Sequence, residues 1–288
     1  MIDFVKLHER NFNFRLFVSN VLAEDLGDGD HTSLSTIPAK HKGRMKLLVK
    51  ENGILAGVEA TKRIIKQIDK SVKIKILIKD GAAVKKGDIA FTLEGNTRSL
   101  LCAERLVLNV MQRMSGIATK THYLQSLCKG SHTKVIDTRK TTPGFRFFEK
   151  WAVVIGGGAN HRYGLYDMIL IKDNHIDFAG GITKAIDSAN TYLKKKGKKL
   201  RIEVETRNLE DVKAVLKHGK VHRIMLDNYS PAETLKAVKL INGKYEVESS
   251  GGITEKNIAA YAKCGVDFIS IGALTHQVKS LDLSLKAF

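Results

Sequence analysis

Cysteine is scarce in this sequence, and its few copies lie far apart. The chain of 288 residues has three cysteines, Cys102, Cys128 and Cys264. They form no CxxC pair, and no histidine lies at zinc-like spacing from them. A disulfide framework and a cysteine-ligated metal centre are therefore both excluded. We expect reduced, buried thiols in a cytoplasmic protein.

Long apolar runs are also missing. No stretch approaches the roughly 18 uninterrupted apolar residues of a membrane-spanning helix. The first residues, MIDFVKLHERNFNF, interleave acidic and basic side chains and hold no apolar core of signal-peptide length. The sequence therefore predicts no membrane span.

Acidic residues are few relative to basic ones. Lys and Arg number 48 against 30 Asp and Glu, which gives a net charge of +18. Such an excess raises nucleic acid or an anionic lipid surface as a partner. Part of it is local, in a lysine run over 194–199 that is typical of a solvated helix end or loop. The run has no interleaved aromatic residues, so a basic nucleic-acid-binding protein is kept only as a distant alternative.

The overall composition is that of a globular enzyme. Apolar residues make up 43% of the chain and charged residues 27%, and either value is ordinary for a protein with a full core. The length exceeds that of a typical single domain. Length and composition are therefore compatible with two domains or with one large α/β barrel.

The first third of the chain predicts short strands and helices. Helical spacing occurs over 14–24 and 57–68, and short strands are expected between residues 43 and 95. The acidic stretch 24–32 has oxygen-bearing residues suited to calcium but lacks the glutamate at the twelfth position, so we expect a structural turn. The strongest helix is predicted over 103–127, bridging the two domains.

The rest of the chain alternates apolar strands with helix-length segments. This alternation is typical of βαβ units and a parallel sheet, so an α/β barrel or incomplete barrel of six to seven strands is expected, with a doubly wound sheet still possible. The predicted strands are 134–139, 167–172, 200–206, 223–228, 245–250 and 267–272, and the predicted helices are 179–194, 208–218, 231–241 and 254–264.

Polar residues follow these strands almost without exception. Charge beside a buried strand is costly unless it is paired or used, and the loops after the strands of a parallel barrel converge on one site. The set predicts a site that binds an anion with several negative oxygens. Its members are Arg139 with Lys140, Lys172, Glu205, Asp227, Ser249 with Ser250, and Gly272.

Two glycine-bearing turns come last. Ser250-Gly251-Gly252 and Ile271-Gly272 follow the final two strands, where barrels commonly bind phosphate through backbone N–H groups. Glu205 and Asp227 can bind sugar hydroxyls or hold Mg²⁺, while arginines suit carboxylates and lysines suit phosphate. The residues alone thus predict a dicarboxylate pocket beside a phosphosugar pocket.

Several long motifs occur in order and cover nearly the whole chain: EDLGDGDHTS, ERLVLNVMQRMSGIAT, DTRKTTPGFRFFEKWAV, GGGANHRYGLYDMILIKDNH, EVET, IMLDN, ESSGGI and ISIGALTH. Together they resemble the quinolinate phosphoribosyltransferase family. The segment between EVET and IMLDN is slightly long, which leaves open whether Glu203 or Glu205 is the substrate-facing carboxylate. A molybdenum-transport-associated homologue of the same fold is the alternative within the fold, and the intact LIKDNH and IMLDN favour the quinolinate enzyme.

The resemblance implies a reaction and an architecture. Phosphoribose passes from phosphoribosyl pyrophosphate to quinolinate with decarboxylation, giving nicotinate mononucleotide, pyrophosphate and CO₂ for NAD biosynthesis, with Mg²⁺ as cofactor. The implied fold is an N-terminal α/β sandwich domain over residues 1–112, joined by the tail 276–288, and a C-terminal α/β barrel over residues 113–275. Family members are homodimers with shared active sites or larger assemblies such as hexamers.

The resemblance also assigns residues. The catalytic set is Lys140, Glu205 and Asp227, with Mg²⁺ held mainly through the substrate and through Glu205 and Asp227. Five residues would bind quinolinate, with the first reaching in from the partner subunit: Arg105, Arg139, His161, Arg162 and Lys172. The phosphoribosyl group would contact Thr138, Lys140, Ser250, Gly251, Gly252, Ile271 and Gly272.

Overall fold

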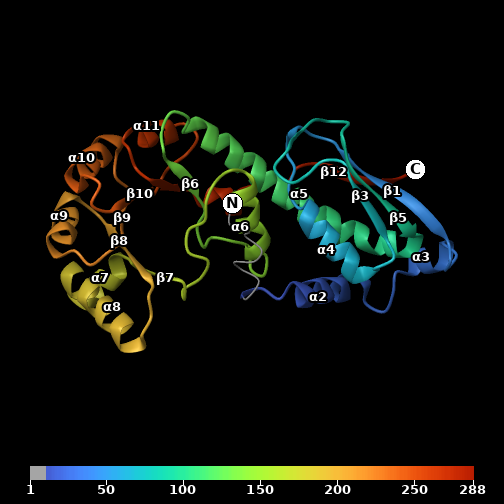
Figure 1. Cartoon of the computed structure of the whole chain (residues 1–288), viewed down its shortest axis with the longest axis horizontal. Helices are drawn as coiled ribbons and strands as arrows, with labels where there is room; N and C mark the ends of the chain where they lie inside the picture. Colours follow the sequence, from blue (N-terminus) through green and yellow to red (C-terminus); the bar gives the residue numbers. More distant parts are fainter. Residues whose placement is uncertain (1–10) are drawn as a thin grey trace. The chain divides into compact units, whose positions relative to one another are not determined.

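The computed structural model describes residues 11–288, which form two compact units (Figure 1). Residues 1–10 lie outside the described residues. They include the start of the predicted first domain and most of the stretch in which no signal peptide is expected. The first unit comprises the chain up to His122, Thr141–Gly157 and Thr275–Phe288. The second comprises Tyr123–Lys140 and Gly158–Leu274.

The first unit is built on a four-stranded antiparallel sheet. Its strand order is β12-β1-β5-β3. Strands β2 and β4 pair with each other in a separate two-stranded sheet. The strands are β1 (Lys42–Val49), β2 (Gly53–Ile54), β3 (Lys73–Ile76), β4 (Ala83–Val84), β5 (Ile89–Asn96) and β12 (Leu283–Ala287). The helices are α2 (Phe14–Leu26), α3 (His31–Thr36), α4 (Val58–Ile68) and α6 (Arg146–Ile155).

Alternation along the central strand explains this sheet. Met45, Leu47 and Val49 of β1 are buried while the residues between them are not, because successive side chains of a strand point to opposite faces. Phe91 and Leu93 of β5 are also buried. One face of the sheet therefore forms a core and the other is more exposed.

One helix of 31 residues, α5 (Thr97–Leu127), runs from the first unit into the second. It begins six residues before the predicted start at Ala103. The C-terminal segment runs along it, since the Leu281 amide donates to the Gln112 carbonyl at 3.0 Å. A Cβ at Gly116 would lie 2.3 Å from the Lys279 carbonyl oxygen, so only glycine permits this close approach.

The segment 141–157 belongs to the first compact unit, whereas the predicted domains, which meet between residues 112 and 113, include it in the barrel domain. Phe147 and Phe148 of α6 pack against Phe12, their ring centroids 4.4 and 5.5 Å from it. Buried Glu149 also pairs with Arg113 of α5, Oε1 lying 2.8 Å from Nη2. These long-range contacts draw α6 out of the barrel, although it follows a barrel strand in the chain.

The second unit is a six-stranded, all-parallel sheet. Its order is β6-β11-β10-β9-β8-β7. Strands that follow one another in the chain are neighbours in the sheet, except that β6 pairs with the last strand, β11, and not with β7. The predicted α/β class with an incomplete barrel is therefore confirmed. The strands are β6 (Lys134–Ile136), β7 (Met168–Ile171), β8 (Arg201–Thr206), β9 (Arg223–Asp227), β10 (Glu246–Ser250) and β11 (Phe268–Ser270).

Helices connect these strands, and local signals set most of their ends. Ser230 caps α10 (Pro231–Ile241) in a capping box with Glu233, as the sequence predicts. Asn208 accepts from the Asp211 amide and starts α9 (Leu209–His218). The other helices are α7 (Asp173–Ala179), α8 (Ile182–Lys196), α11 (Ile258–Lys263) and α12 (Ala273–His276).

Two predicted helices differ from those observed. The helix expected over 179–194 is α8, which begins at Ile182 because Gly180 and Gly181 adopt positive φ before it, and the short helix α7 on the other side of these glycines was not expected. The helix expected from Thr254 begins only at Ile258, after a turn in which Asn257 Oδ1 accepts from the Thr254 amide.

Two expectations from composition can be compared with the structure. All three cysteines are unpaired, with Cys128 and Cys264 buried and Cys102 half-buried. Across residues 11–288, no helix combines the length and apolar character needed to cross a membrane.

Candidate active site

The predicted site residues of the second unit lie at one end of its sheet. Arg139 and Lys140 follow β6, Lys172 follows β7, and Asp227 and Ser250 end β9 and β10. Asp227 and Ser250 are direct partners in the parallel register. Because the carboxyl ends of parallel strands meet at one edge, these side chains share the barrel mouth.

One wall of the mouth is acidic. Glu205 of β8 lies beside Lys172, whose Nζ is 3.8 Å from Oε2 of the carboxylate. Burial, and then the neighbouring Asp227 carboxylate, raise the pKa of Glu205, and Lys172 opposes them. Glu205 and Asp227 therefore form a pair of hard oxygen donors with a lysine beside them.

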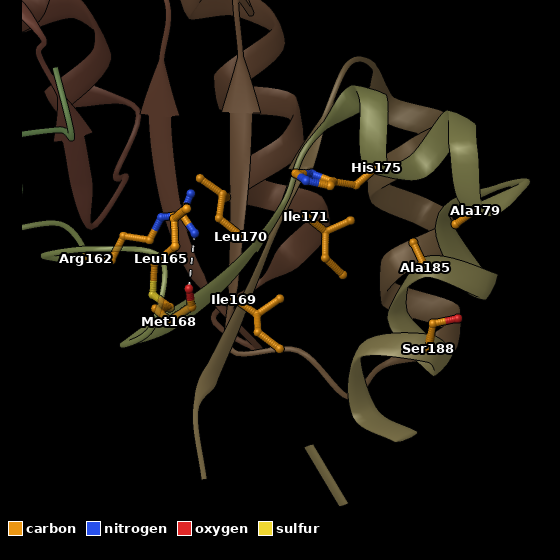
Figure 2. Close-up of a pocket in the computed structure, with 10 residues that line it drawn as sticks. All are labelled: Arg162, Leu165, Met168, Ile169, Leu170, Ile171, His175, Ala179, Ala185 and Ser188. Carbon is orange, nitrogen blue, oxygen red and sulfur yellow. Dashed lines mark hydrogen bonds between the residues drawn. The ribbon is translucent and has the colours of Figure 1, made fainter. Parts of the chain in front are cut away.

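The other wall carries two guanidinium groups. Arg162 is half-buried and donates through Nη1 to the Met168 carbonyl at 3.2 Å, the bond drawn in Figure 2. Burial, and then the charge of nearby Arg139, lower the pKa of Arg162. Two like charges held near one another favour a ligand that brings two negative charges.

A cavity of about 380 Å³ lies along β7 on the side of this wall. Figure 2 shows Leu170 close to Arg162 and Leu165, while Ile171 lies between His175 and Ala185. The lining is mainly apolar, and Arg162 is the only predicted site residue in it. This cavity therefore differs from the polar mouth at the strand ends.

The structure places Glu203 one layer below Glu205. Both side chains point to the same face of β8 because they are two residues apart. Glu203 is fully buried, its Oε2 lying 2.9 Å from His161 Nε2 and 3.9 Å from Arg223 Nη1. Glu205 is the carboxylate at the mouth, and Glu203 belongs to the barrel interior.

A second buried carboxylate completes this inner layer. Glu248 of β10 has Oε2 at 2.9 Å from Arg223 Nη1 and 3.6 Å from His161 Nε2. Burial and the neighbouring Glu203 raise the pKa of Glu248 to about 8, and burial also raises the pKa of Glu203. At neutral pH the layer therefore retains a proton.

Buried Asp137 holds the loop that carries His161. Its Oδ1 accepts from the His161 amide at 3.0 Å, and its Oδ2 accepts from Asn160 Nδ2. Sequence reasoning did not single out Asp137, Arg223 or Glu248. For Asp137 and Glu248 a signal was available, because each is an acidic residue in or next to an apolar strand, at the start of DTRK and within EVESS.

The glycine turn after β10 packs tightly on the turn after β9. A Cβ on Gly251 would lie 2.2 Å from Asn228 Oδ1 and 2.9 Å from its amide nitrogen. Within residues 11–288, the amides of Gly251 and Gly252 donate to no protein oxygen. They can serve an anion, and they do so from the turn itself, because helix α11 begins only at Ile258.

The remaining predicted residues lie as follows. Thr138 Oγ1 accepts from the Lys140 amide at 3.0 Å, which bends the loop after β6. The Ile271 amide donates to the Ile136 carbonyl at 3.0 Å, and Gly272 follows it. Arg105 lies exposed on α5 in the first unit, so it is the one predicted quinolinate residue outside the second unit.

The donor set at the mouth fits a hard divalent cation. Mg²⁺ prefers oxygen ligands, keeps several waters and commonly binds one or two carboxylates together with substrate phosphates. Glu205 and Asp227 provide such carboxylates. His161, Glu203 and Glu248 also have ligand atoms within 4.8 Å of one another, but this group is buried and contacts Arg223.

Known proteins match this chain over almost all of its length. The models described as quinolinate phosphoribosyl transferase, N-terminal domain and C-terminal domain, match residues 30–115 and 117–286. A chloroplastic nicotinate-nucleotide pyrophosphorylase [carboxylating] of Arabidopsis thaliana is 46% identical, with 96% of this chain and 83% of that protein covered.

Solved structures agree with these matches. NadC from Streptococcus pyogenes superposes with a TM-score of 0.88 at 37% identity, covering 94% of this chain and 95% of that one. The nicotinate-nucleotide pyrophosphorylase from Francisella tularensis gives 0.87 at 40% identity, covering 96% of each chain.

Proposed function

The chain belongs to the quinolinate phosphoribosyltransferase family, and from this premise we propose how its residues carry out the reaction. The enzyme transfers phosphoribose from phosphoribosyl pyrophosphate to quinolinate with decarboxylation, a step of NAD biosynthesis. Nicotinate mononucleotide, pyrophosphate and CO₂ are the products. One observation supports the residue assignment. The mouth of the barrel brings together two guanidinium groups, those of Arg139 and Arg162, and a pair of carboxylates, those of Glu205 and Asp227.

The guanidinium wall binds quinolinate. This substrate has two adjacent carboxylates on a planar ring, and planar guanidinium forks bind carboxylates in two-point contacts. Arg139 and Arg162 supply the forks, and Lys172 adds a point charge beside them. Holding the ring in this way aims its nitrogen at the donor and lowers the entropic cost of the encounter.

The acidic wall receives the phosphoribosyl donor. Glu205 and Asp227 bind the ribose hydroxyls and the Mg²⁺ that accompanies the pyrophosphate, while Lys140 contacts the donor's phosphate groups. When bound, Mg²⁺ offsets the negative charge on the departing pyrophosphate. The free amides of Gly251 and Gly252, with Ser250 and Gly272, bind the 5-phosphate.

No protein nucleophile is required. The ring nitrogen forms a bond to the ribose carbon as that carbon loses pyrophosphate, and the carbon passes through a cationic, oxocarbenium-like state. Carboxylates fixed near it stabilise that charge, which is electrostatic preorganisation. CO₂ then leaves from the adjacent ring carbon, and the electron pair of the broken bond stays on that carbon, where the positive ring nitrogen stabilises it until the carbon takes up a proton.

Arg105 is proposed to complete the quinolinate pocket of a partner subunit in a homodimer. It is exposed and belongs to the other structural unit, which supports a role outside its own chain's site. Mixing Arg105→Ala chains with Lys140→Ala chains should restore activity, because each mixed dimer contains one intact site. Confirmed mixed dimers without activity would contradict site sharing.

The decisive assay follows nicotinate mononucleotide with purified protein, quinolinate, phosphoribosyl pyrophosphate and Mg²⁺. We expect product with quinolinate and none with nicotinate, since the pocket holds two carboxylates. Chelation of Mg²⁺ should abolish turnover while leaving quinolinate binding by calorimetry intact. Equal turnover of nicotinate, or no product at all, would overturn the substrate assignment and would reopen the molybdenum-transport-associated alternative.

We also propose that the enzyme works in a reducing compartment such as the cytoplasm. The three unpaired cysteines support this assignment.

A further inference from the structure

Asn228, the residue directly after β9, has a left-handed backbone at the mouth of the barrel. Its φ is +58°, and within residues 11–288 Lys220 and Asn242 are the other residues besides glycine with a positive φ. Those two lie in the connections that lead into β9 and β10, at the opposite end of the sheet. A left-handed residue other than glycine is uncommon, and such residues concentrate at functional sites.

This turn brings the side chain of Asn228 back to the carboxylate of the preceding residue. Successive side chains of a regular strand point to opposite faces, so neighbours in the sequence do not normally meet. Here Asn228 Nδ2 donates to Asp227 Oδ2 at 2.7 Å, and the backbone amide of Asn228 donates to the Ser250 carbonyl at 2.9 Å. One residue thus holds the Asp227 carboxylate and ties the turn to the neighbouring strand β10.

The residue type at position 228 suits both tasks. Glycine, asparagine and aspartate adopt the left-handed conformation most readily. Glycine has no side chain, and an ionised aspartate has no N–H to donate, whereas asparagine has an NH₂ group. Of these three residue types, asparagine alone combines the turn with a hydrogen bond to a carboxylate.

The Asp227 carboxylate benefits from such a donor because a second carboxylate lies near it. Burial, and then the charge of Asp227, raise the pKa of Glu205. Two neighbouring carboxylates repel each other, so an unheld Asp227 side chain would turn away from Glu205. The Asn228 amide opposes that rotation and keeps the two sets of oxygen donors together.

We propose that Asn228 is a positioning residue for Asp227 and acts through it on the phosphoribosyl donor. The amide fixes the Asp227 carboxylate in advance, so that less side-chain freedom is lost when the ribose hydroxyls and Mg²⁺ bind. The inference rests on the proposed role of Asp227. Two rival roles are a direct contact of Asn228 with the donor and mere support of the turn at Gly251, where a Cβ would lie 2.2 Å from Asn228 Oδ1.

Asn228→Gly removes the side-chain amide and keeps the left-handed backbone. The kcat/KM for phosphoribosyl pyrophosphate should fall about tenfold, since a lost hydrogen bond to a charged group corresponds to roughly that factor. The Kd for quinolinate, measured by calorimetry, should not change. Asn242→Gly is the matched control, because it makes the same substitution at an exposed left-handed residue after α10, and it should leave the kinetics unchanged.

A double-mutant cycle with Asp227→Ala distinguishes the three roles. Calorimetry follows the binding of phosphoribosyl pyrophosphate with Mg²⁺ in the presence of phthalate, which has two adjacent carboxylates but no ring nitrogen to react. If Asn228 acts through Asp227, Asn228→Gly weakens binding in the otherwise unaltered chain and has no further effect in the Asp227→Ala chain. A direct contact, or support of the Gly251 turn, would weaken binding equally in both chains and would overturn the proposal.

The other outcomes of these measurements also decide the question. A urea midpoint of Asn228→Gly well below that of Asn242→Gly would make the side chain structural and would refute the positioning role. Unchanged donor binding in Asp227→Ala would refute the proposed role of Asp227, and the inference with it. Weaker binding in Asp227→Ala together with unchanged binding in Asn228→Gly would refute this inference alone and leave the proposed function standing.

Discussion

The buried ion pair of the first unit gives a quantitative prediction. Glu149 is fully buried and accepts four hydrogen bonds, from Arg113 Nε at 3.1 Å and Nη2 at 2.8 Å, and from the Thr142 amide and hydroxyl at 3.0 and 2.9 Å. Arg113 also donates to the carbonyls of Thr275 and Val278. One carboxylate thus joins α5, α6 and the loop before α6, and its arginine partner reaches the C-terminal segment.

Glu149→Ala should lower the free energy of unfolding by about 3 to 5 kcal/mol. That range is the cost of removing one partner of a buried pair, which leaves the guanidinium uncompensated. Glu149→Gln keeps an acceptor for Thr142 and should cost roughly half as much. In the double variant Arg113→Met with Glu149→Ala, the uncompensated charge is gone, so the two changes should cost about 1 to 3 kcal/mol less than their sum.

Urea denaturation followed by tryptophan fluorescence measures these effects. Trp151 is the only tryptophan, lies buried in α6 two residues from Glu149, and therefore reports on this unit. Glu59→Ala, which breaks an exposed pair with Lys62, serves as the control and should change stability by less than about 1 kcal/mol. A folded Glu149→Ala protein with a loss below about 1 kcal/mol, or strict additivity in the double variant, would refute the reasoning.

Three further predictions concern the second unit. The folded pKa of Glu248, about 8, lies above its unfolded value of about 4.3, so this group lowers stability progressively as pH rises between those values, by at most about 1.4 kcal/mol per pH unit. Hydrogen exchange of β10 amides should show a weaker loss of protection from pH 6 to 8 in Glu248→Gln, and an unchanged slope would contradict this. Gly251→Ala should raise the KM for phosphoribosyl pyrophosphate more than Gly252→Ala, because its Cβ would meet Asn228 while that of Gly252 meets nothing within 4 Å; equal effects would argue against a tight turn. Arg139→Ala should weaken quinolinate binding by roughly 2 to 5 kcal/mol in calorimetry, and unchanged affinity would remove Arg139 from the pocket.

Local sequence signals predicted the barrel elements well where the determining contacts are themselves local. Helix α10 runs over its predicted residues because Ser230, Pro231 and Glu233 lie within four positions of one another. The helix expected over 179–194 was confirmed from Ile182 onward, but the spacing of apolar residues did not reveal the short helix α7, which Gly180 and Gly181 separate from α8.

Long-range packing explains what the sequence could not reveal. Strand-end positions pointed to Glu205 and Asp227, since a strand that ends in charge is visible in the pattern. The layer of Arg223, Glu203 and Glu248 depends on how strands β8, β9 and β10 align, which no single segment specifies. The same holds for α6, whose assignment to the first unit depends on aromatic contacts with residues more than a hundred positions away.

The position of β12 has a consequence for how the protein is made. The sheet of the first unit has β12 at its edge, paired with β1 over Met45↔Ala287 to Val49↔Leu283. During synthesis β1 leaves the ribosome long before its partner strand β12. Until β12 emerges, β1 therefore presents an unpaired edge, which is the kind of surface that associates with other chains. The emergence of β12, more than the folding of either unit, is the event that closes this edge.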